Sequence, residues 1–525
     1  MSDTTELGHA EPDEKSTHSN DERAKAVKDG DLERQETMKE GEVATQAAEA
    51  ARHEWIRTAP ESPRNWPLWR KWWIISGLIF YTIIVFICNT GFVTDQAEDQ
   101  FNVNTELSVM GQSFFILGIA IGPMFLAPLS EVHGRQPVYT TGIFLFSILQ
   151  IPAALSPTYA GLITARFLAG CFAGIPLSNV GASAADLFTT SHTAWPIMVF
   201  SFCSQVVGPC LGPVIGSAIY MAVLDNIDSW NVEFRKLFDL FLDACVMHCI
   251  MERKFTHLFQ RQVWSLTFGE TLHDKVYEKH TGIKQNKSAT AYIGRELGRA
   301  AIFLCTEPIV MALALTTTFL FGLIFIYLQG YTFVYEDHFN LSTLPEGAMF
   351  LVSILGGFVA LATQPVQNYL YRRSAASTST GKPRPEARLY TACFAVWIML
   401  ISIFWFAFTA SNNKSYQIPM WSGFLFGYAE VAIYTGLWQY GTDAYGENAG
   451  SALAAINLPA NTAACGLAHA ALPFFKNVGN RWTLGILGFT CVLYLAVPPL
   501  LVYFGQWLRK RSPYALSREG GAADE

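Results

Sequence analysis

Apolar segments of about twenty residues recur along this chain, and their spacing constrains its fold more than any other feature. An α-helix rises about 1.5 Å per residue, so about twenty apolar residues cross a hydrocarbon core about 30 Å thick. A helix also satisfies its own backbone hydrogen bonds, which lipid cannot do. The pattern predicts an all-α polytopic membrane protein. We place spans at residues 72–93, 107–127, 137–155, 159–180, 195–221, 308–330, 347–370, 389–410, 418–440, 451–475 and 482–506.

The composition agrees with this prediction and excludes two other classes of protein. Of the 525 residues, 51% are hydrophobic and only 15% are charged, and the mean hydropathy is +0.24. A soluble chain of this length needs a polar surface that this composition cannot supply. The net charge of -7 lies in residues 1–57, and the rest of the chain is neutral. A nucleic-acid-binding protein that works through a basic surface is therefore also excluded.

The distribution of positive charge predicts how the spans are oriented. If the N-terminus is cytoplasmic, the inner segments hold 22 lysine and arginine residues and the outer loops hold three. Cytoplasmic loops of membrane proteins show this enrichment in basic residues. The bias holds only if a twelfth span lies between residues 222 and 252, where the apolar pattern is weak. We therefore expect two halves of six helices each, with both termini in the cytoplasm.

These spans divide the chain into five parts. Residues 1–57 are rich in charged residues and hold one aromatic side chain, so we expect a disordered cytoplasmic tail. Residues 58–251 form the N-terminal six-helix half, and residues 308–506 form the C-terminal six-helix half. Residues 252–307 form a basic cytoplasmic linker between them, and residues 507–525 form a cytoplasmic C-terminal tail.

Short sequence patterns indicate which covalent modifications and metal sites to expect. N-glycosylation sequons at Asn340 and Asn413 fall in predicted outer loops, so we expect glycosylation there. Nine of the ten cysteines lie in apolar spans or in the weak segment 222–252, and Cys305 lies in the predicted cytoplasmic linker, so we expect no structural disulfide. The cysteines and histidines between residues 245 and 257 match no established ligand spacing, and we predict no metal site.

A charged turn is predicted at the inner end of the second span, in the segment 122–137 that begins at Gly122. The prolines of this segment predict the end of the helix, and Gly134 permits a tight turn. Glu131 and Arg135 can pair with each other or cap neighbouring helix ends. We interpret the segment as a small charged latch between two spans; the alternative is an ordinary interfacial turn.

An arginine lies in the body of the fourth span. An arginine at such a position costs several kcal/mol unless it faces a watery cavity or has a partner, and it is therefore functional by default. Arg166 is that residue, within the sequence TARFLAGCFAG. The alternative to a functional role is a structural ion pair.

Glycine recurs at every fourth position of the fifth span, at Gly208, Gly212 and Gly216, and proline follows two of them, at Pro209 and Pro213. Such a stripe leaves one face of the helix smooth and allows a close contact with another helix. The prolines remove backbone donors and bend the span.

Together these segments resemble the major facilitator superfamily, in the form found in fungal twelve-span drug:proton antiporters. Residues 122–137 resemble its motif A, although Gln136 stands at a position that is usually basic, and Arg166 resembles the arginine of motif B. Residues 208–216 resemble motif C, the antiporter signature. The resemblance continues at residues 307–309, 385–389 and 443–455. It implies a major facilitator fold, a role of Arg166 in proton coupling, and proton-driven export.

Polar residues in the second half are candidates for proton and substrate binding. Glu430 lies near the middle of the span 418–440. Burial favours the neutral form of a carboxyl, which suits a group that takes up and releases a proton. The alternative is a neutral, hydrogen-bonded glutamic acid without that role. Candidates for lining a cavity for a flat or cationic ligand are Gln205, Tyr434, Trp438, Asn457 and Asn461.

The segment 229–254 departs from the family resemblance. Its uninterrupted apolar stretch is far shorter than a span, and Asp239 and Asp243 lie one helical turn apart. One interpretation is a specialised, charged sixth helix that faces the cavity. The others are a mispredicted splice junction or a decayed gene, in which case the protein as written would not transport.

The function that these features predict is efflux of a small organic compound, drug, toxin or secondary metabolite in exchange for protons, across the plasma membrane or alternatively the vacuolar membrane. The partners would be a small-molecule substrate, protons and the lipid bilayer, and we expect a monomer without a cofactor and without nucleic acid. The alternatives are a nutrient or polyamine importer on the same fold and an inactive remnant. The chain shows no Walker-type phosphate-binding motif, and no nucleophile and base cluster that would indicate an enzyme.

Overall fold

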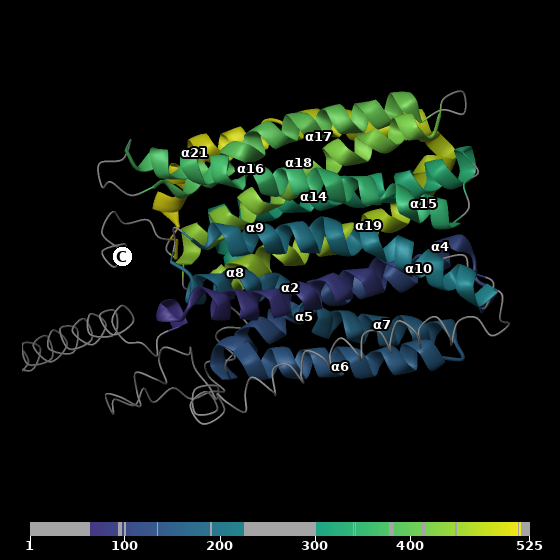
Figure 1. Ribbon diagram of the computed structural model, residues 1–525, viewed down its shortest axis with the longest axis horizontal. Coiled ribbons are helices and arrows are strands. Elements are labelled where there is room, and N and C mark those ends of the chain that lie inside the picture. Colours follow the sequence, from purple (N-terminus) through teal and green to yellow (C-terminus); the bar gives the residue numbers. More distant parts are fainter. Residues whose placement is uncertain are drawn as a thin grey trace, which may run out of the picture. The chain divides into compact units, whose positions relative to one another are not determined.

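Figure 1 shows the computed structural model of the protein, in which the helices run side by side. Contacts divide the chain into the units Met1–Asn65 and Trp66–Glu525, and all helices below except the short η1 (Pro63–Asn65) belong to the second unit. The predicted tail 1–57, the predicted twelfth span, both sequons and most of the linker lie outside the described residues. The structure describes residues 63–92, 97–98, 101–133, 135–189, 192–224, 301–339, 341, 343–376, 383–410, 415–446, 449–512 and 514–515.

The helices of the N-terminal half are drawn from purple to teal in Figure 1. They are α2 (Leu68–Thr90), α4 (Thr105–Ser108), α5 (Met110–His133), α6 (Arg135–Leu155), α7 (Tyr159–Ala173), α8 (Ile175–Leu187), α9 (Ala194–Phe202), the π-helical turn η2 (Cys203–Val207) and α10 (Gly208–Leu224).

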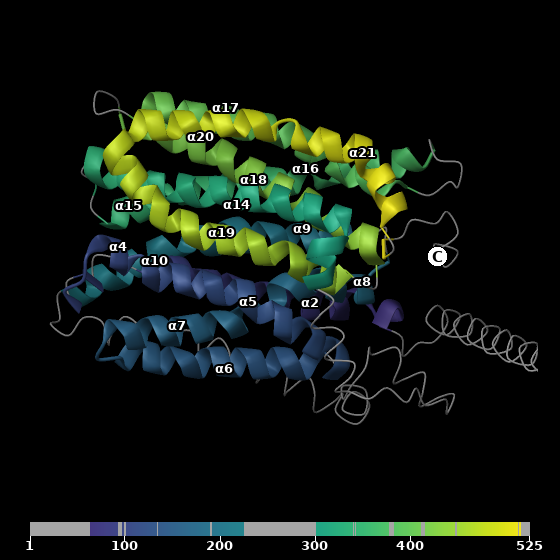
Figure 2. The ribbon, with the colours of Figure 1, turned by 180° about the vertical axis from the view of Figure 1, so that it is seen from behind.

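The helices of the C-terminal half are drawn from green to yellow, and Figure 2 shows the same arrangement from behind. They are α14 (Pro308–Phe333), the π-helical turn η3 (Val334–His338), α15 (Thr343–Met349), α16 (Leu351–Ala375), η4 (Pro385–Leu389), α17 (Tyr390–Thr409), α18 (Gln417–Tyr445), α19 (Ala449–Val478), α20 (Asn480–Tyr494) and α21 (Val497–Arg511).

The predicted spans coincide with these helices. Within the described ranges, nine helical segments are long and apolar enough to cross a membrane. The other two predicted spans correspond to α18 and α19, which have 29 and 30 residues and are therefore long enough. Both are less apolar because much of their surface is buried against other helices and does not face lipid. The protein is a multi-pass helical membrane protein, as predicted.

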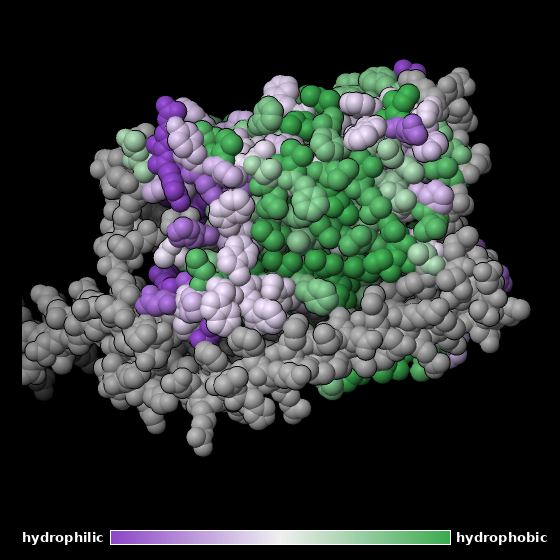
Figure 3. Space-filling view, viewed as in Figure 1, coloured by the Kyte–Doolittle hydropathy of each residue, from purple (hydrophilic) through white to green (hydrophobic). Residues whose placement is uncertain are grey.

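The outer surface agrees with a lipid environment. Figure 3 shows an apolar surface over the middle of the helices, with hydrophilic residues gathered toward one end. Large apolar side chains of α17, such as Phe394, Trp397 and Ile401, are more than half exposed. Side chains of this kind on the surface of a soluble protein would form an unusually large apolar patch. On a membrane protein they are the expected contact with lipid tails.

One detail of the predicted spans was wrong. The prolines at 123 and 128 do not end α5, which continues to His133 because neighbouring helices tolerate proline within a membrane span. The fourth predicted span is confirmed as the candidate span Tyr159–Gly181, and its helix has a one-residue break at Gly174, between α7 and α8. Pro176 lies in the first turn of α8, where its missing N–H costs no helical hydrogen bond.

Glycines bring α5 and α7 into close backbone contact. A Cβ on Gly122 would lie 1.9 Å from the carbonyl oxygen of Cys171, and a Cβ on Gly170 would lie 2.2 Å from that of Phe115. Small residues allow helix backbones to approach in this way, and the resulting van der Waals contact replaces the hydrophobic driving force that lipid removes.

In the C-terminal half, glycines bring α16 and α18 into the same kind of close backbone contact. A Cβ on Gly356 would lie 1.9 Å from the carbonyl oxygen of Phe424, and a Cβ on Gly427 would lie 2.2 Å from that of Ser353. The second and fourth spans of each half are thus joined by the same kind of contact. This correspondence agrees with two structurally related halves, as is common in transporters.

The two halves contact each other at both ends. Toward the predicted outer side, α10 packs on α15, and Gln329 Nε2 donates a hydrogen bond to Gln112 Oε1 at 3.4 Å. Toward the predicted inner side, α18 packs on α8 and α9, and Gln439 Nε2 donates to the carbonyl of Ala194 at 3.0 Å. The centre between the halves is therefore closed at both ends in this structure.

A pair of glycine-to-alanine variants tests the glycine contacts. We expect Gly356→Ala to lower the stability of the purified protein by about 1–3 kcal/mol, because the added methyl group clashes with backbone that cannot move alone. The measurement is thermal unfolding in detergent. The control is Gly466→Ala in α19, where no atom lies within 4 Å of the added Cβ, and where alanine should stabilise the helix by about 0.5–1 kcal/mol. Equal effects of the two variants would contradict this account.

Candidate transport site

Arg166 is buried between three helices of the N-terminal half. Its side chain is 1% exposed. Nε donates to the carbonyl of Gly111 in α5 at 2.7 Å, and Nη2 donates to the carbonyl of Cys88 in α2 at 3.3 Å. The guanidinium also lies 4.5 Å from the ring centroid of Phe92 and 5.2 Å from that of Phe115. Backbone carbonyls and aromatic faces thus stabilise the charge.

Asn89 is a polar residue next to this site that the sequence prediction missed. It follows Cys88 in α2 and is 1% exposed, and neither atom of its amide has a hydrogen-bond partner within the described ranges. Buried amides are normally hydrogen-bonded, so this one has capacity for a water molecule or another ligand. The available signal was an asparagine in the body of an apolar span.

The predicted glycine stripe of α10 packs on α2, as its spacing indicates. A Cβ on Gly212 would lie 2.0 Å from Thr90 Oγ1, and a Cβ on Gly216 would lie 2.4 Å from the carbonyl oxygen of Gly91. Further along the same stripe, a Cβ on Gly208 would lie 2.7 Å from the Cβ of Phe86. No side chain larger than hydrogen fits at these positions without movement of α2.

The prolines of α10 affect both its start and its contact with the other half. Pro209 has no N–H to donate to the carbonyl of Gln205, and the π-helical turn η2 lies directly before it. Near Pro213, Gly347 of α15 approaches closely, since a Cβ on it would lie 2.9 Å from the carbonyl oxygen of Pro213. Helix α10 therefore connects α2 with the C-terminal half.

The charged latch predicted at residues 122–137 is described only in part. Gly122 lies in the close contact of α5 with α7, and the chain turns between the end of α5 and the start of α6 at Arg135. Gly134 and the side chains of Glu131 and Arg135 lie outside the part of the chain that the structure describes. The ion pair between Glu131 and Arg135 remains a prediction.

Glu430 lies in α18 between the two halves. Its side chain is 4% exposed, and none of the described residues forms a hydrogen bond or ion pair with its carboxyl by ordinary geometric criteria. The thiol of Cys210, from α10, lies close enough to interact with it electrostatically. An isolated ionised carboxylate is costly at such a position, so the closed arrangement favours a protonated Glu430.

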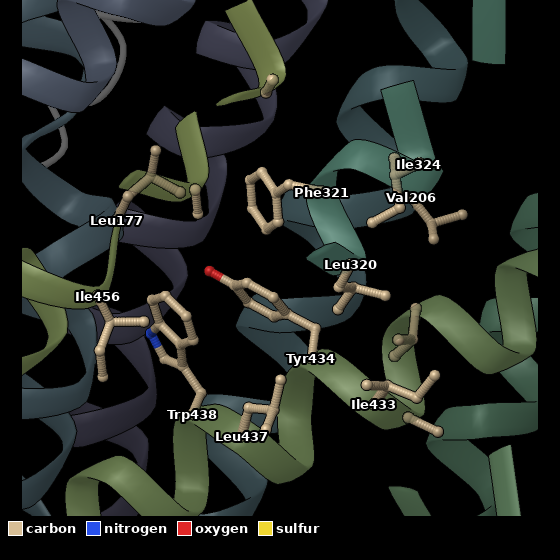
Figure 4. Packing of buried hydrophobic residues seen from close by; sticks show 14 of the residues in the cluster. Leu177, Val206, Leu320, Phe321, Ile324, Ile433, Tyr434, Leu437, Trp438 and Ile456 are labelled. Atoms are coloured by element: carbon tan, nitrogen blue, oxygen red, sulfur yellow. The ribbon is translucent and has the colours of Figure 1, made fainter. Parts of the chain in front are cut away.

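Aromatic side chains form a row one and two helical turns further along α18. The rings of Tyr434 and Trp438 stack with centroids 4.3 Å apart and planes inclined by 21°. On the other side, the ring of Phe321 in α14 lies 6.0 Å from that of Tyr434. Figure 4 shows this row within an apolar frame that includes Leu177 of α8 and Ile456 of α19. Residues of both halves thus surround the row.

The structure brings together three of the five predicted cavity residues. The hydroxyl of Tyr434 lies near the side chain of Gln205 in η2, although the contact falls outside hydrogen-bond geometry, and Trp438 is the stacked neighbour. The other two lie together on α19, where Asn461 Nδ2 donates to the carbonyl of Asn457 at 3.0 Å.

A network of charged residues at the predicted inner end of the C-terminal half was not predicted. Arg388 Nε and Asp443 Oδ2 form a buried ion pair at 2.7 Å, and the guanidinium lies over the ring of Tyr371 at 3.5 Å. Glu386 accepts two hydrogen bonds from Arg509, at 2.7 and 2.9 Å. These contacts join η4, α16, α18 and α21.

A third carboxylate completes this network. Tyr445 donates to Glu307 Oε2 at 3.1 Å, and the hydroxyl of Ser512 donates to the same oxygen. The sequence resemblance had marked the segments around Glu307, Glu386 and Asp443, but no spacing rule pairs residues from opposite ends of a half. The network fastens the inner ends of the C-terminal helices to one another.

A helical membrane fold with two related halves and buried polar residues between them is typical of transporters. The sequence profile of the Major Facilitator Superfamily matches residues 74–469. The chain belongs to this superfamily, as its motifs indicated, and it is a transporter and not an enzyme.

Relatives agree with this assignment. An uncharacterized transporter of Schizosaccharomyces pombe is 31% identical over 462 residues, covering 88% of this chain and 83% of the relative. The efflux pump radE of Floropilus chiversii is 28% identical, covering 86% and 83% of the two chains. The solved structure of the human organic anion transporter MFSD10 has a TM-score of 0.53 at 14% identity and covers 82% of this chain and all of that one. The last likeness concerns the fold alone.

A double-mutant cycle tests the buried ion pair of the C-terminal half. We expect Arg388→Gln to lower the stability by about 3–5 kcal/mol, because it leaves the carboxylate of Asp443 buried without its partner. The double variant Arg388→Gln with Asp443→Asn should regain part of that loss, since no lone charge remains. Thermal unfolding in detergent measures both. The exposed Arg372→Gln on α16 is the control, and an equally large effect of that variant would contradict the assignment.

Proposed function

We propose that this protein exports a small organic compound, a drug, toxin or secondary metabolite, in exchange for protons across the plasma membrane, with both termini in the cytoplasm. The observation that carries the proposal is the glycine and proline stripe of α10. The glycines of the stripe let α10 approach α2 closely, and α10 also contacts α15 of the C-terminal half. A relative that is named as an efflux pump supports the direction of transport.

The second part of the proposal concerns the proton that is exchanged during transport. Glu430 is buried between the halves without a hydrogen-bonding partner within the described ranges, and the closed arrangement therefore favours its protonated form. When the halves part, water reaches the carboxyl and lowers the cost of its charge. Opening and proton release are thus coupled through the solvation of one side chain.

Arg166 acts in the N-terminal half. Its guanidinium links α7 to the carbonyls of Gly111 and Cys88. A positive charge favours the ionised form of any carboxyl that comes near it. Arg166 would thus favour the deprotonated form of a carboxyl in the open conformation, and the predicted latch of residues 122–137 would stabilise one of the two conformations.

Expression in an efflux-deficient yeast strain tests this function. We expect the protein to reduce the retention of compounds from a panel of dyes and toxins, and a protonophore should abolish that effect. Arg166→Ala should reduce export about tenfold or more, which corresponds to a loss of about 1.4 kcal/mol or more. Glu430→Gln keeps the shape of the side chain and removes its proton exchange, so the remaining export should no longer respond to the protonophore.

The exposed Arg372→Gln serves as the control for the loss of a positive charge, and equal surface expression of all variants is established first. Export that ignores the protonophore in the unchanged protein would contradict proton coupling. If cells that express the protein accumulate more of a compound than cells without it, export would be contradicted and the importer alternative favoured. No transport of any compound would favour an inactive protein.

A further inference from the structure

Two buried donors at the centre of the molecule lack a well-formed hydrogen bond within the described ranges. Trp438 is fully buried and its indole N–H has no partner, and Tyr434 is 1% exposed, with its hydroxyl near the Gln205 side chain but outside hydrogen-bond geometry. Leaving a buried donor without a hydrogen bond is costly. A donor of this kind is available to a ligand that reaches it.

The position of these donors indicates which parts of the protein such a ligand would contact. Figure 4 shows the Tyr434 hydroxyl pointing away from the backbone of α18, toward the space between Phe321 and Leu177. Leu177 belongs to the N-terminal half, and Phe321 and Trp438 belong to the C-terminal half. A compound that meets the two donors would therefore contact both halves, which is the requirement for a compound that crosses between them.

The surroundings indicate the chemistry of the compound. The rings of Phe321, Tyr434 and Trp438 present aromatic faces, and the labelled neighbours in Figure 4 are aliphatic. The indole N–H can only donate, so its partner must be an acceptor. None of the side chains labelled in Figure 4 is charged, so the row itself offers no counter-charge to a cation.

We propose that Tyr434 and Trp438 bind an uncharged, planar aromatic compound that carries a hydrogen-bond acceptor such as a carbonyl. This inference rests on the proposed export function and specifies its substrate class. In the closed structure the two rings stack on each other. When the halves part, the aromatic ring of the substrate stacks on this pair, and its acceptor receives the hydrogen bonds that the closed state lacks.

Two fluorescent tricyclic probes of the same size test the substrate class. N-methylacridone is planar, neutral and carries a carbonyl, whereas N-methylacridinium is planar and permanently cationic without an acceptor. Binding to the full-length protein in lipid nanodiscs is measured by fluorescence anisotropy, with empty nanodiscs as the background. No proton gradient is present, so the result does not depend on proton coupling or on the direction of transport.

We expect N-methylacridone to bind at least about tenfold more tightly than N-methylacridinium. Tyr434→Phe and Trp438→Phe each keep an aromatic ring and remove one donor, so each should weaken the binding of the neutral probe about three- to tenfold. The matched control is Tyr494→Phe in α20. Tyr494 is also buried, its hydroxyl also lacks a partner among the described residues, and its ring also stacks, on Phe319 at 5.0 Å.

Three outcomes would overturn the proposal. Equal or tighter binding of the cationic probe would show that charge, and not an acceptor, determines binding. Unchanged binding of the neutral probe to both Tyr434→Phe and Trp438→Phe would place its site elsewhere. A loss of binding in Tyr494→Phe as large as in Tyr434→Phe would assign the effect to folding. Binding with the expected pattern, together with export that ignores protons, would retain this inference and refute the coupling.

Discussion

Close backbone contact between helices is the constraint on which the rest of this structure depends. In lipid, apolar side chains gain little by leaving one apolar surface for another, so helices associate where their backbones can approach. Glycines provide that approach between α5 and α7, between α16 and α18, and between α2 and α10. The first contact places Arg166 of α7 against α5, and the second holds α18, which carries Glu430 and the aromatic row, against α16.

Polar groups in the membrane interior are the second organising element. Each is costly unless it is satisfied, and the protein treats them in two ways. The charged residues at the predicted inner end of the C-terminal half are paired with one another and hold their helices together. The polar groups at the centre, among them Glu430, Tyr434 and Trp438, lack such partners within the described ranges. A transporter needs both kinds of polar group. The helices of one half must stay together at their ends, while the residues at the centre bind and release substrate and protons.

Much of the architecture could be predicted from the sequence because membrane spans follow a local rule. Length and apolarity identify a span without knowledge of its neighbours, and the predicted spans coincide with observed helices. The breaks within spans were harder to predict. The helix of the fourth span breaks at Gly174, just before Pro176. The prolines of α5, in contrast, do not end α5. The same residue types have different effects because the neighbouring helices decide whether a lost backbone hydrogen bond is tolerated.

The sequence by itself determined that this chain is a helical membrane protein of the Major Facilitator Superfamily, and it predicted functional roles for Arg166 and the stripe from Gly208 to Gly216. These conclusions depend on composition and on spacing within one helix. Only the tertiary structure decided that Arg388 pairs with Asp443, and that Tyr434 and Trp438 stack at the junction of the halves with unsatisfied donors. Such relations join residues of different helices, or depend on which atoms are buried, and the spacing of residues along one chain carries neither kind of information.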